Sequence, residues 1–363
     1  MNKLALHIGC HGDQGFTLQL DCELPGSGIT AVYGPSGSGK STLLDCIAGL
    51  REAAPGSIVR LGSHTWQDAG IAVPTWKRQI GYVFQDARLF PHLNVQQNLQ
   101  YALTRRHQES KLHLSQVVNW LELDELLTSA TDTLSAGQKQ RVAIGRALVS
   151  SPHLLLLDEP LANLDHTSRQ NCMRCLQRVS QDLQLPMLYV SHDIEEVSQL
   201  ADYLLLLDGG RLVEQGSMFA LSGRLDTRLA QEEQAAAILV ARVARHDTQY
   251  GLTELDVEGH TLFVNHLAHA PGESRRIRIP ARDVSVCRQR PRDSSILNIL
   301  PVVLDEVEDT DNARLLLRLS LGSQYLLARI TRRSAVELGL QVGDQLYAQI
   351  KSAALLTEAS DSL

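Results

Sequence analysis

The sequence predicts an α/β fold with a parallel central sheet, followed by a separate all-β region. Two observations predict the sheet: a glycine-rich turn at 34–41 lies between an apolar run and a helical pattern, and a second apolar run, 154–157, ends in two carboxylates. Beyond residue 238 short segments alternate apolar and polar side chains, which is typical of half-buried strands. We therefore expect two regions of different structural class.

The glycine-rich turn matches the pattern G-x-x-x-x-G-K-[ST]. Residues 29–33 before it predict a buried strand, and 42–48 after it predict a helix. In that context glycines turn backbone N–H groups toward an anion, and the helix N-terminus adds positive potential. Lys40 can reach the outer phosphates of a nucleotide, and Ser41 is placed to hold Mg²⁺. The residues expected to bind nucleotide here are Gly34, Pro35, Ser36, Gly37, Ser38, Gly39, Lys40, Ser41 and Thr42.

The apolar run 154–157 predicts a second parallel strand, which delivers its acids to the C-terminal edge of the sheet. Asp158 is expected to orient Mg²⁺, and Glu159 to position the attacking water. An apolar strand that ends in Asp-Glu is common in proteins. This one indicates a nucleotide site because it follows a phosphate loop in the sequence.

Residues 134–138 read Leu-Ser-Ala-Gly-Gln and precede a segment with helical periodicity. They resemble the signature motif of ABC-transporter ATPases, with Ala136 as a small-for-small replacement at the third position. The resemblance implies a P-loop NTPase with a RecA-like ABC ATPase core and a helical subdomain at about 86–150. It also implies a homodimer in which the signature residues of one protomer contact ATP held by the other. These residues are Ser135, Gly137 and Gln138.

Three further segments match this family in the expected order. Gln85 corresponds to the glutamine that senses Mg²⁺ and the γ-phosphate, Asp165 belongs to the loop that crosses the dimer interface, and His192 corresponds to the switch histidine. Asn163 stands where a serine is frequent in that loop. The resemblance therefore implies Glu159, His192, Gln85 and Lys40 as catalytic residues, and Ser41, Gln85 and Asp158 as Mg²⁺ ligands.

The residue that stacks on adenine stays open between two candidates. Many ABC ATPases use an aromatic side chain in the loop after the first strand. Here that loop, 9–15, contains His11, and Phe16 stands just beyond it.

Composition limits the class of protein. The chain has 363 residues, 44% hydrophobic residues and a formal net charge of −7, which predicts more than one globular domain and argues against a general nucleic-acid binder. No apolar stretch reaches the roughly 18 to 20 residues that span a bilayer, and the N-terminus lacks a signal pattern. We expect a peripheral protein on the cytoplasmic face of the inner membrane, held there by a partner.

The chain is expected to divide at three places. Residues 1–228 form the nucleotide-binding domain, the Ala-Gln-Glu-rich stretch 229–237 forms a polar helical link, and 238–363 form a β region. Strand patterns repeat in that region, which fits an OB-like architecture of two small barrels or of a single mixed β-domain. The sequence leaves these two alternatives open.

Several segments are similar to the ATP-binding subunit of molybdate importers: residues 82–92, 186–192 and 346–352. That resemblance implies ATP and Mg²⁺ as cofactors, two membrane-spanning permease subunits, and an external molybdate-binding protein that acts through the permease. Residues 84–92 are expected to touch the membrane subunit. An importer for sulfate, tungstate, a sugar or a polyamine stays an alternative, as does an oxyanion sensor or store, or an ABC ATPase that acts on DNA or ribosomes.

The resemblance also places a Mop-like, molybdate-binding domain at about 292–357. Hydroxyl, amide and ammonium groups suit a tetrahedral dianion, and the candidate residues are Ser294, Ser295, Asn298, Lys351 and Ser352. Related domains often read Ser-Ala-Arg-Asn where this chain has residues 295–298, so an arginine is lost. A regulatory molybdate site and a fold kept for dimer contacts both stay open.

Overall fold

The computed structural model describes residues 3–12, 15–105, 112–267, 270–310 and 313–351. The chain divides into two compact units, Met1–Gly216 and Ser217–Leu363. This division, after Gly216, precedes the predicted boundary at 228.

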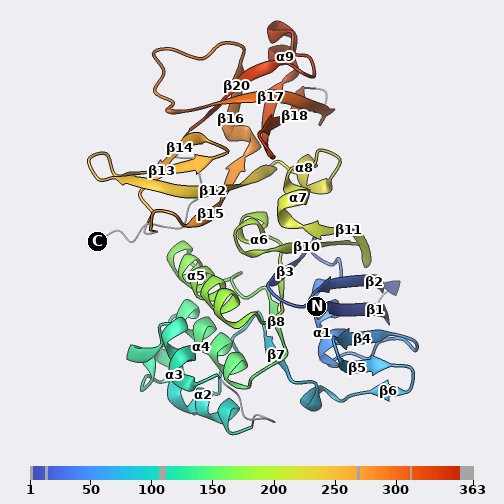
Figure 1. The fold of residues 1–363 in the computed structure, drawn as a ribbon. Helices are drawn as coiled ribbons and strands as arrows, with labels where there is room; N and C mark the ends of the chain where they lie inside the picture. Colours follow the sequence, from blue (N-terminus) through green and yellow to red (C-terminus); the bar gives the residue numbers. More distant parts are fainter. Residues whose placement is uncertain (1–2, 13–14, 106–111, 268–269, 311–312, 352–363) are drawn as a thin grey trace. The chain divides into compact units, whose positions relative to one another are not determined.

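The first unit is built on an 11-stranded sheet in the order β6-β5-β4-β1-β2-β11-β10-β3-β9-β8-β7. The strands β10, β3, β9, β8 and β7 pair in parallel, whereas β1, β2, β4, β5 and β6 pair as antiparallel neighbours. Figure 1 shows β7 between the antiparallel strands on one side and the helices α2, α3 and α4 on the other. The strands are β1 (Lys3–His11), β2 (Thr17–Pro25), β3 (Ile29–Tyr33), β4 (Ile58–Leu61), β5 (His64–Asp68), β6 (Ile71–Ala72), β7 (Ile80–Val83), β8 (Leu154–Asp158), β9 (Met187–Ser191), β10 (Tyr203–Asp208) and β11 (Arg211–Ser217).

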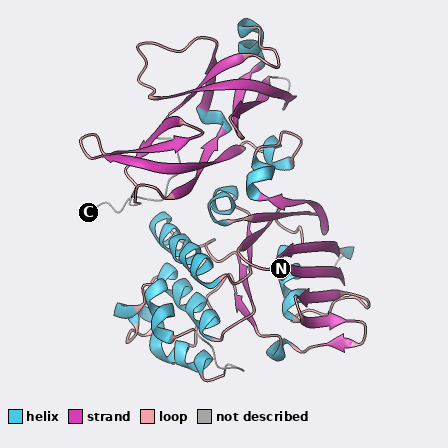
Figure 2. Ribbon diagram, viewed as in Figure 1, coloured by secondary structure: helices cyan, strands magenta, loops and turns pink. Residues whose placement is uncertain are grey.

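Helices follow the parallel strands, as the α/β prediction requires. Figure 2 shows the helices of this unit in cyan and its strands in magenta. Three of them, α2, α3 and α4, group together beside β7 (Figure 1) and correspond to the predicted helical subdomain. The strand predicted at 29–33 and the helix predicted over 42–48 are both confirmed by β3 and α1. The helices of this unit are α1 (Lys40–Ala48), α2 (Val95–Leu103), α3 (Leu114–Trp120), α4 (Ala136–Val149), α5 (His166–Leu183) and α6 (Ile194–Leu200).

Strand β8 shows how the core positions the site. Leu155 and Leu157 join a buried cluster with side chains of α2, α3, α4 and α5. Leu154 and Leu156 point to the other face and join a cluster with α1 and the antiparallel strands. Alternate residues of a strand face opposite sides, so both faces are buried, as expected of a parallel sheet between helices. The next two residues, Asp158 and Glu159, therefore emerge at the C-terminal edge.

The second unit begins with two short helices and continues as two antiparallel sheets, one of 4 strands (β14-β13-β12-β15) and one of 5 strands (β16-β20-β17-β18-β19). Its elements are α7 (Met218–Ser222), α8 (Arg228–Gln231), β12 (Ala236–Asp247), β13 (Leu252–Val257), β14 (His260–Asn265), β15 (Ser274–Pro280), β16 (Val284–Cys287), β17 (Asn298–Asp309), β18 (Arg314–Leu321), β19 (Gln324–Thr331), α9 (Arg332–Leu338) and β20 (Gln345–Ile350). The all-β prediction for this region is confirmed.

One buried cluster spans both sheets of this unit. It contains Leu239 and Leu255 from the first sheet and Leu304, Leu326 and others from the second. A shared core describes a single β-domain with two sheets, because separate barrels would each enclose their own core.

The predicted helical link at 229–237 differs from the structure. Helix α8 ends at Gln231, and β12 begins at Ala236. Ala237 is buried and pairs with Ile279 of β15. Pairing with a neighbouring strand overrides the helix propensity of an Ala-Gln-Glu composition, because propensity is a weak preference beside tertiary contacts.

Candidate functional site

The phosphate loop approaches its surroundings closely. A Cβ atom on Gly34 would lie 2.1 Å from the carbonyl oxygen of Leu207, so only glycine fits there. Gly39 precedes α1 with a φ of 99°, a left-handed conformation that favours glycine. The backbone of the loop is thus set by contacts that exclude a side chain at both positions.

Lys40 points back into the loop. Its Nζ donates hydrogen bonds to the carbonyl oxygens of Gly34 at 2.8 Å and Pro35 at 2.9 Å. Burial lowers the pKa of Lys40, and the negative charges of Glu159 and Asp158 oppose that effect. Within the part of the chain that the structure describes, the buried Ser38 hydroxyl has no hydrogen-bond partner. A cation and an unused hydroxyl in a turn at a helix N-terminus suit a phosphate group.

The loop lines a cavity of about 380 Å³. The cavity also includes Glu159, so the structure brings the two main sequence motifs to one place. Two lining residues, Gly12 and Arg51, were not among the residues that the sequence predicted for the site. Of the two candidates for the adenine, Phe16 lines the cavity. The complete lining is Gly12, Phe16, Ser36, Gly37, Gly39, Lys40, Ser41, Thr42, Arg51 and Glu159.

The predicted Mg²⁺ residues Ser41 and Asp158 lie together. The Ser41 hydroxyl donates to Asp158 Oδ1 at 3.0 Å, and the Tyr82 hydroxyl lies 3.1 Å from Asp45 Oδ1 and 3.4 Å from Asp158 Oδ2. Burial raises the pKa of Asp158, whereas the hydrogen bonds from Ser41 and Tyr82 lower it. One hydroxyl and one carboxylate fit Mg²⁺, which in nucleotide sites is held largely by phosphate oxygens and water.

Glu159 and His192 are in contact. His192 Nδ1 lies 3.3 Å from Glu159 Oε2, and the Glu159 N–H donates to the carbonyl oxygen of Val190 at 3.1 Å. Glu159 has a φ of 43°, which is uncommon for a residue with a side chain and is often found at functional sites. The residue with this uncommon backbone conformation is also the one whose carboxylate lines the phosphate cavity.

The signature residues lie elsewhere in the unit. Ser135 caps α4: its hydroxyl accepts the N–H of Gln138 at 3.2 Å, and the Gln138 side chain accepts the N–H of Ser135 at 2.9 Å. Gly137 is buried against α5, since a Cβ there would lie 2.6 Å from the Cβ of Ser168. Within the residues described, none of the three lines the phosphate cavity.

Asp165 begins α5. Its carboxylate accepts the N–H of Ser168 at 3.0 Å, and the bonds from Ser168 lower the pKa of Asp165. The side chain is exposed, so the residue caps a helix while remaining at the surface.

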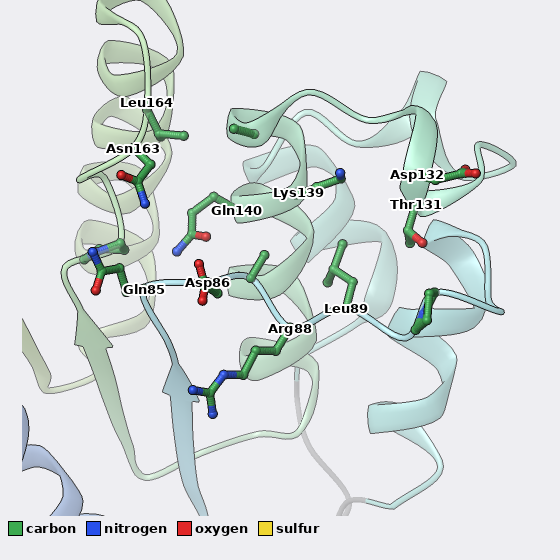
Figure 3. A pocket seen from close by; sticks show the side chains of 14 residues that line it. Gln85, Asp86, Arg88, Leu89, Thr131, Asp132, Lys139, Gln140, Asn163 and Leu164 are labelled. Carbon is green, nitrogen blue, oxygen red and sulfur yellow. The ribbon is translucent and has the colours of Figure 1, made fainter.

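Gln85 lies at a second cavity, of about 460 Å³, and not in the phosphate cavity. Figure 3 shows this cavity between the segment that follows β7, the side chains of α4 and the start of α5. The segment is attached to α4 because Gln140 Nε2 donates to the Phe84 carbonyl oxygen at 3.4 Å and Arg146 donates to that of Ala87 at 3.2 Å. Its lining is Gln85, Asp86, Ala87, Arg88, Leu89, Pro91, Thr131, Asp132, Ala136, Lys139, Gln140, Pro160, Asn163 and Leu164.

The candidate oxyanion residues of the second unit are only partly brought together. Asn298 pairs with Ile350 in the sheet, so Lys351 comes one residue after its partner. However, Asn298 is fully buried, and its amide accepts the Phe263 N–H at 2.6 Å and donates to the Phe263 carbonyl oxygen at 2.9 Å. This amide is therefore committed to the backbone of β14 and does not face a solvent site as expected.

The remaining oxyanion candidates lie at the surface. Ser294, Ser295 and Lys351 are exposed, and the Ser294 hydroxyl accepts the N–H of Ile296 at 3.1 Å. Ser352 lies outside the residues that the structure describes.

No helix among the described residues is both long and apolar enough to cross a membrane.

Comparison with known families and proteins agrees with this geometry. Residues 18–162 match the model of the ABC transporter family, and residues 294–356 match that of the TOBE domain. Similar solved structures include a dimeric post-hydrolysis state of the ATP-binding cassette MJ0796 bound to ADP and Pi, at 26% identity and a TM-score of 0.50 over 60% of this chain and 99% of that chain. Another is cbiO1 from Clostridium perfringens, part of the ABC transporter complex cbiONQ, at 26% identity and a TM-score of 0.51 over 60% and 89% of the two chains.

Relatives of known name cover nearly the whole chain. The "Molybdenum import ATP-binding protein ModC 1" of Azotobacter vinelandii is 45% identical over 94% of this chain and 96% of its own length. The corresponding protein of Methylococcus capsulatus is 44% identical over 97% and 99%.

A phosphate loop, a strand that ends in Asp158 and Glu159, and a capped signature helix define the class: an ABC transporter ATP-binding protein. Within that class, the chain belongs to the ModC family of molybdenum import ATP-binding proteins.

Proposed function

We propose that this chain hydrolyses ATP to energise molybdate import through a membrane permease. The single observation that carries the proposal is the cavity in which Lys40, Ser41 and Glu159 meet, in a chain whose full-length relatives are molybdenum import ATP-binding proteins. The assignment of molybdate as the cargo depends on those relatives, because the nucleotide site does not bind the transported ion.

The polar groups in and beside the cavity are proposed to have distinct tasks. Lys40 offsets negative charge on the outer phosphates, and the loop N–H groups hold them. Ser41 and Asp158 would hold Mg²⁺, which neutralises phosphate charge when bound. Glu159 would orient the attacking water, and His192, whose Nδ1 lies 3.3 Å from Glu159 Oε2, would contact the γ-phosphate.

The adenine is proposed to stack on Phe16. This ring lines the phosphate cavity and packs beside Gly39. His11, the other candidate, does not line that cavity among the residues described.

A second copy of the chain is proposed to complete the site. Ser135 is exposed at the start of α4 and stays outside the phosphate cavity of its own protomer. A helix start with free N–H groups attracts phosphate, so Ser135, Gly137 and Gln138 of one protomer would meet ATP bound to the other. Gly137 is buried and also lets α4 and α5 approach closely.

The second cavity (Figure 3) is proposed to dock a permease subunit. Gln85 lies at the cavity, and the segment 85–91 is attached to α4. Movement of Gln85 with the nucleotide would therefore reach the docked partner. Two permease subunits at the cytoplasmic face of the inner membrane would serve the homodimer, and an external molybdate-binding protein would act through them.

The second unit is proposed to bind molybdate weakly at most, through Ser294, Ser295 and Lys351. Because the amide of Asn298 is committed to β14, fewer donors are left than in a complete anion pocket. This unit then serves regulation or dimer contacts.

The test is ATP hydrolysis by the transporter reconstituted with its permease and binding protein. Stimulation of hydrolysis by molybdate and its loss in Glu159→Gln would support the proposal. Stimulation by sulfate alone would assign another cargo. In parallel, isothermal titration of the purified chain with molybdate, with sulfate and phosphate as controls, would test the second unit.

A further inference from the structure

A buried carboxylate beside the site has no part in the proposed chemistry. Glu196, on α6, is only 5% exposed. Its Oε2 accepts hydrogen bonds from the hydroxyls of Tyr189 at 2.7 Å and Ser191 at 2.8 Å. A buried carboxylate is costly unless it is paired, so these partners hold it at a defined position.

Arg169, on α5, joins this acid to a second one. Its Nη1 lies 3.4 Å from Asp193 Oδ2, and its Nε lies 3.5 Å from Glu196 Oε1. Within the described residues the Nε atom makes no aligned hydrogen bond, so its contact with Glu196 is an ion pair. One guanidinium therefore ties α5 to the corner between β9 and α6.

The groups at this corner are the chain neighbours of His192. Asp193 donates its N–H to the Ser191 hydroxyl at 3.0 Å, and Asp193 Oδ1 accepts the Glu195 N–H at 2.8 Å. The backbone is thus fixed on both sides of His192, whose ring reaches Glu159. Shifting Arg169 would loosen both flanking residues.

The other end of this connection is Asp165. Arg169 lies one helical turn after Asp165, and its N–H donates to the Asp165 carbonyl oxygen at 2.9 Å. Residues 159–165 lead from Glu159 to this helix start. These contacts form a closed path. The chain leads from Glu159 to Arg169 on α5, and Arg169 contacts Asp193 and Glu196 at the β9–α6 corner. His192, next to Asp193 in the chain, contacts Glu159 again.

We propose that Arg169 is a positioning residue that fixes His192 relative to Glu159 and passes the placement of residues 162–165 to His192. This inference rests on the proposed homodimer and on the family resemblance, which implies that the loop containing Asp165 crosses the dimer interface. Docking of the second protomer against the start of α5 would then change the position of His192 relative to Glu159. Arg169 itself touches no substrate.

The experiment compares Arg169→Gln, Arg169→Lys and the control Arg178→Gln. Arg178 lies on the same helix, and its guanidinium donates to Asn119 Oδ1 at 3.0 Å, away from the corner. Glu196 keeps its hydrogen bonds from Tyr189 and Ser191 in all three variants, so its buried carboxylate stays paired and all three should fold. We expect Arg169→Gln to lower kcat about tenfold with KM for ATP changed less than about twofold, because only the reacting geometry is lost. Lysine should restore part of the rate, and Arg178→Gln should match the wild type.

Two further measurements separate positioning from general damage. In a His192→Ala background, Arg169→Gln should cause little additional loss, because residues that act through one another are not additive. Amide hydrogen exchange over 190–193 should be faster in Arg169→Gln than in Arg178→Gln, whether or not ATP is hydrolysed.

The inference would be overturned by full additivity with His192→Ala, or by unchanged exchange over 190–193. A wild-type chain without ATPase activity, but with the expected change in exchange, would instead refute the proposed function and leave the structural connection standing.

Discussion

The two units use their polar side chains in opposite ways. In the first, Lys40 and Glu159 line a cavity, and the buried Ser38 hydroxyl in the same loop has no hydrogen-bond partner among the described residues, so these groups keep capacity for a ligand. In the second, Asn298 gives both its donor and its acceptor to the Phe263 backbone. Phe263 lies on β14, an edge strand, so the amide satisfies main-chain groups that a neighbouring strand would otherwise pair. A residue type suited to binding therefore indicates a binding site only where the fold leaves its polar groups available to a ligand.

The largest expected effect is that of Glu159→Gln. Loss of the carboxylate should lower kcat for ATP hydrolysis by about 100-fold or more, a typical magnitude for a general base. ATP-dependent dimerisation should survive, because the phosphate loop is intact. Steady-state ATPase rates and size-exclusion chromatography with ATP would measure both, with the exposed Glu125→Gln as the matched control. Undiminished turnover would remove Glu159 from its role.

Lys40→Ala should act on binding. Losing a buried ammonium that faces phosphate should weaken ATP affinity roughly 10- to 100-fold, since hydrogen bonds to charged groups contribute about 1.5–3 kcal/mol. Titration with a fluorescent ATP analogue would measure the change, and Lys77→Ala, an exposed lysine of the same unit, is the control. Equal affinities in the two variants would contradict the cradle described above.

Asn298→Ala sharpens the contrast from the other side. Removing the amide leaves the Phe263 N–H and carbonyl oxygen without their partner, which should destabilise the second unit by about 2 kcal/mol. Urea unfolding monitored by circular dichroism would report the loss, and the exposed Ser295→Ala should be nearly neutral. Reduced molybdate binding by Asn298→Ala without any loss of stability would show that the amide serves an anion after all.

The smallest effect is a pH dependence from Glu196. Burial raises its pKa above the ordinary value of 4.5, although Tyr189, Ser191 and Arg169 pull the pKa down and Asp193 raises it further. A raised pKa in the folded state means that the folded chain binds this proton more tightly. The stabilising contribution is therefore complete below pH 4.5 and is lost as pH rises through the folded value.

Glu196→Gln cannot titrate at this position. The stability of the wild type relative to this variant should therefore fall as pH increases from about 4 to 7. Unfolding free energies at several pH values would measure the trend. A difference that stays constant with pH would mean that the pKa of Glu196 is not raised.

The sequence was sufficient where spacing along the chain fixes the geometry. The phosphate loop, the buried run of β8 and the start of α4 involve residues a few positions apart, so their patterns carry the local structure. Tyr82 and Arg51 escaped motif reasoning because they reach the site through tertiary contacts. Residues 236 and 237 were wrongly assigned to the helical link for the same reason, since their pairing with β15 cannot be predicted from composition.

The left-handed backbone at Glu159 also sets a limit on how stable the first unit can become. A side chain in that region costs about 1–2 kcal/mol relative to glycine. Substituting glycine would relax the turn and, if nothing else changed, raise the melting temperature while removing the carboxylate from the cavity. Stability and activity therefore make opposite demands at this position. Glycine has the lowest backbone cost there, but it has no carboxylate to activate water.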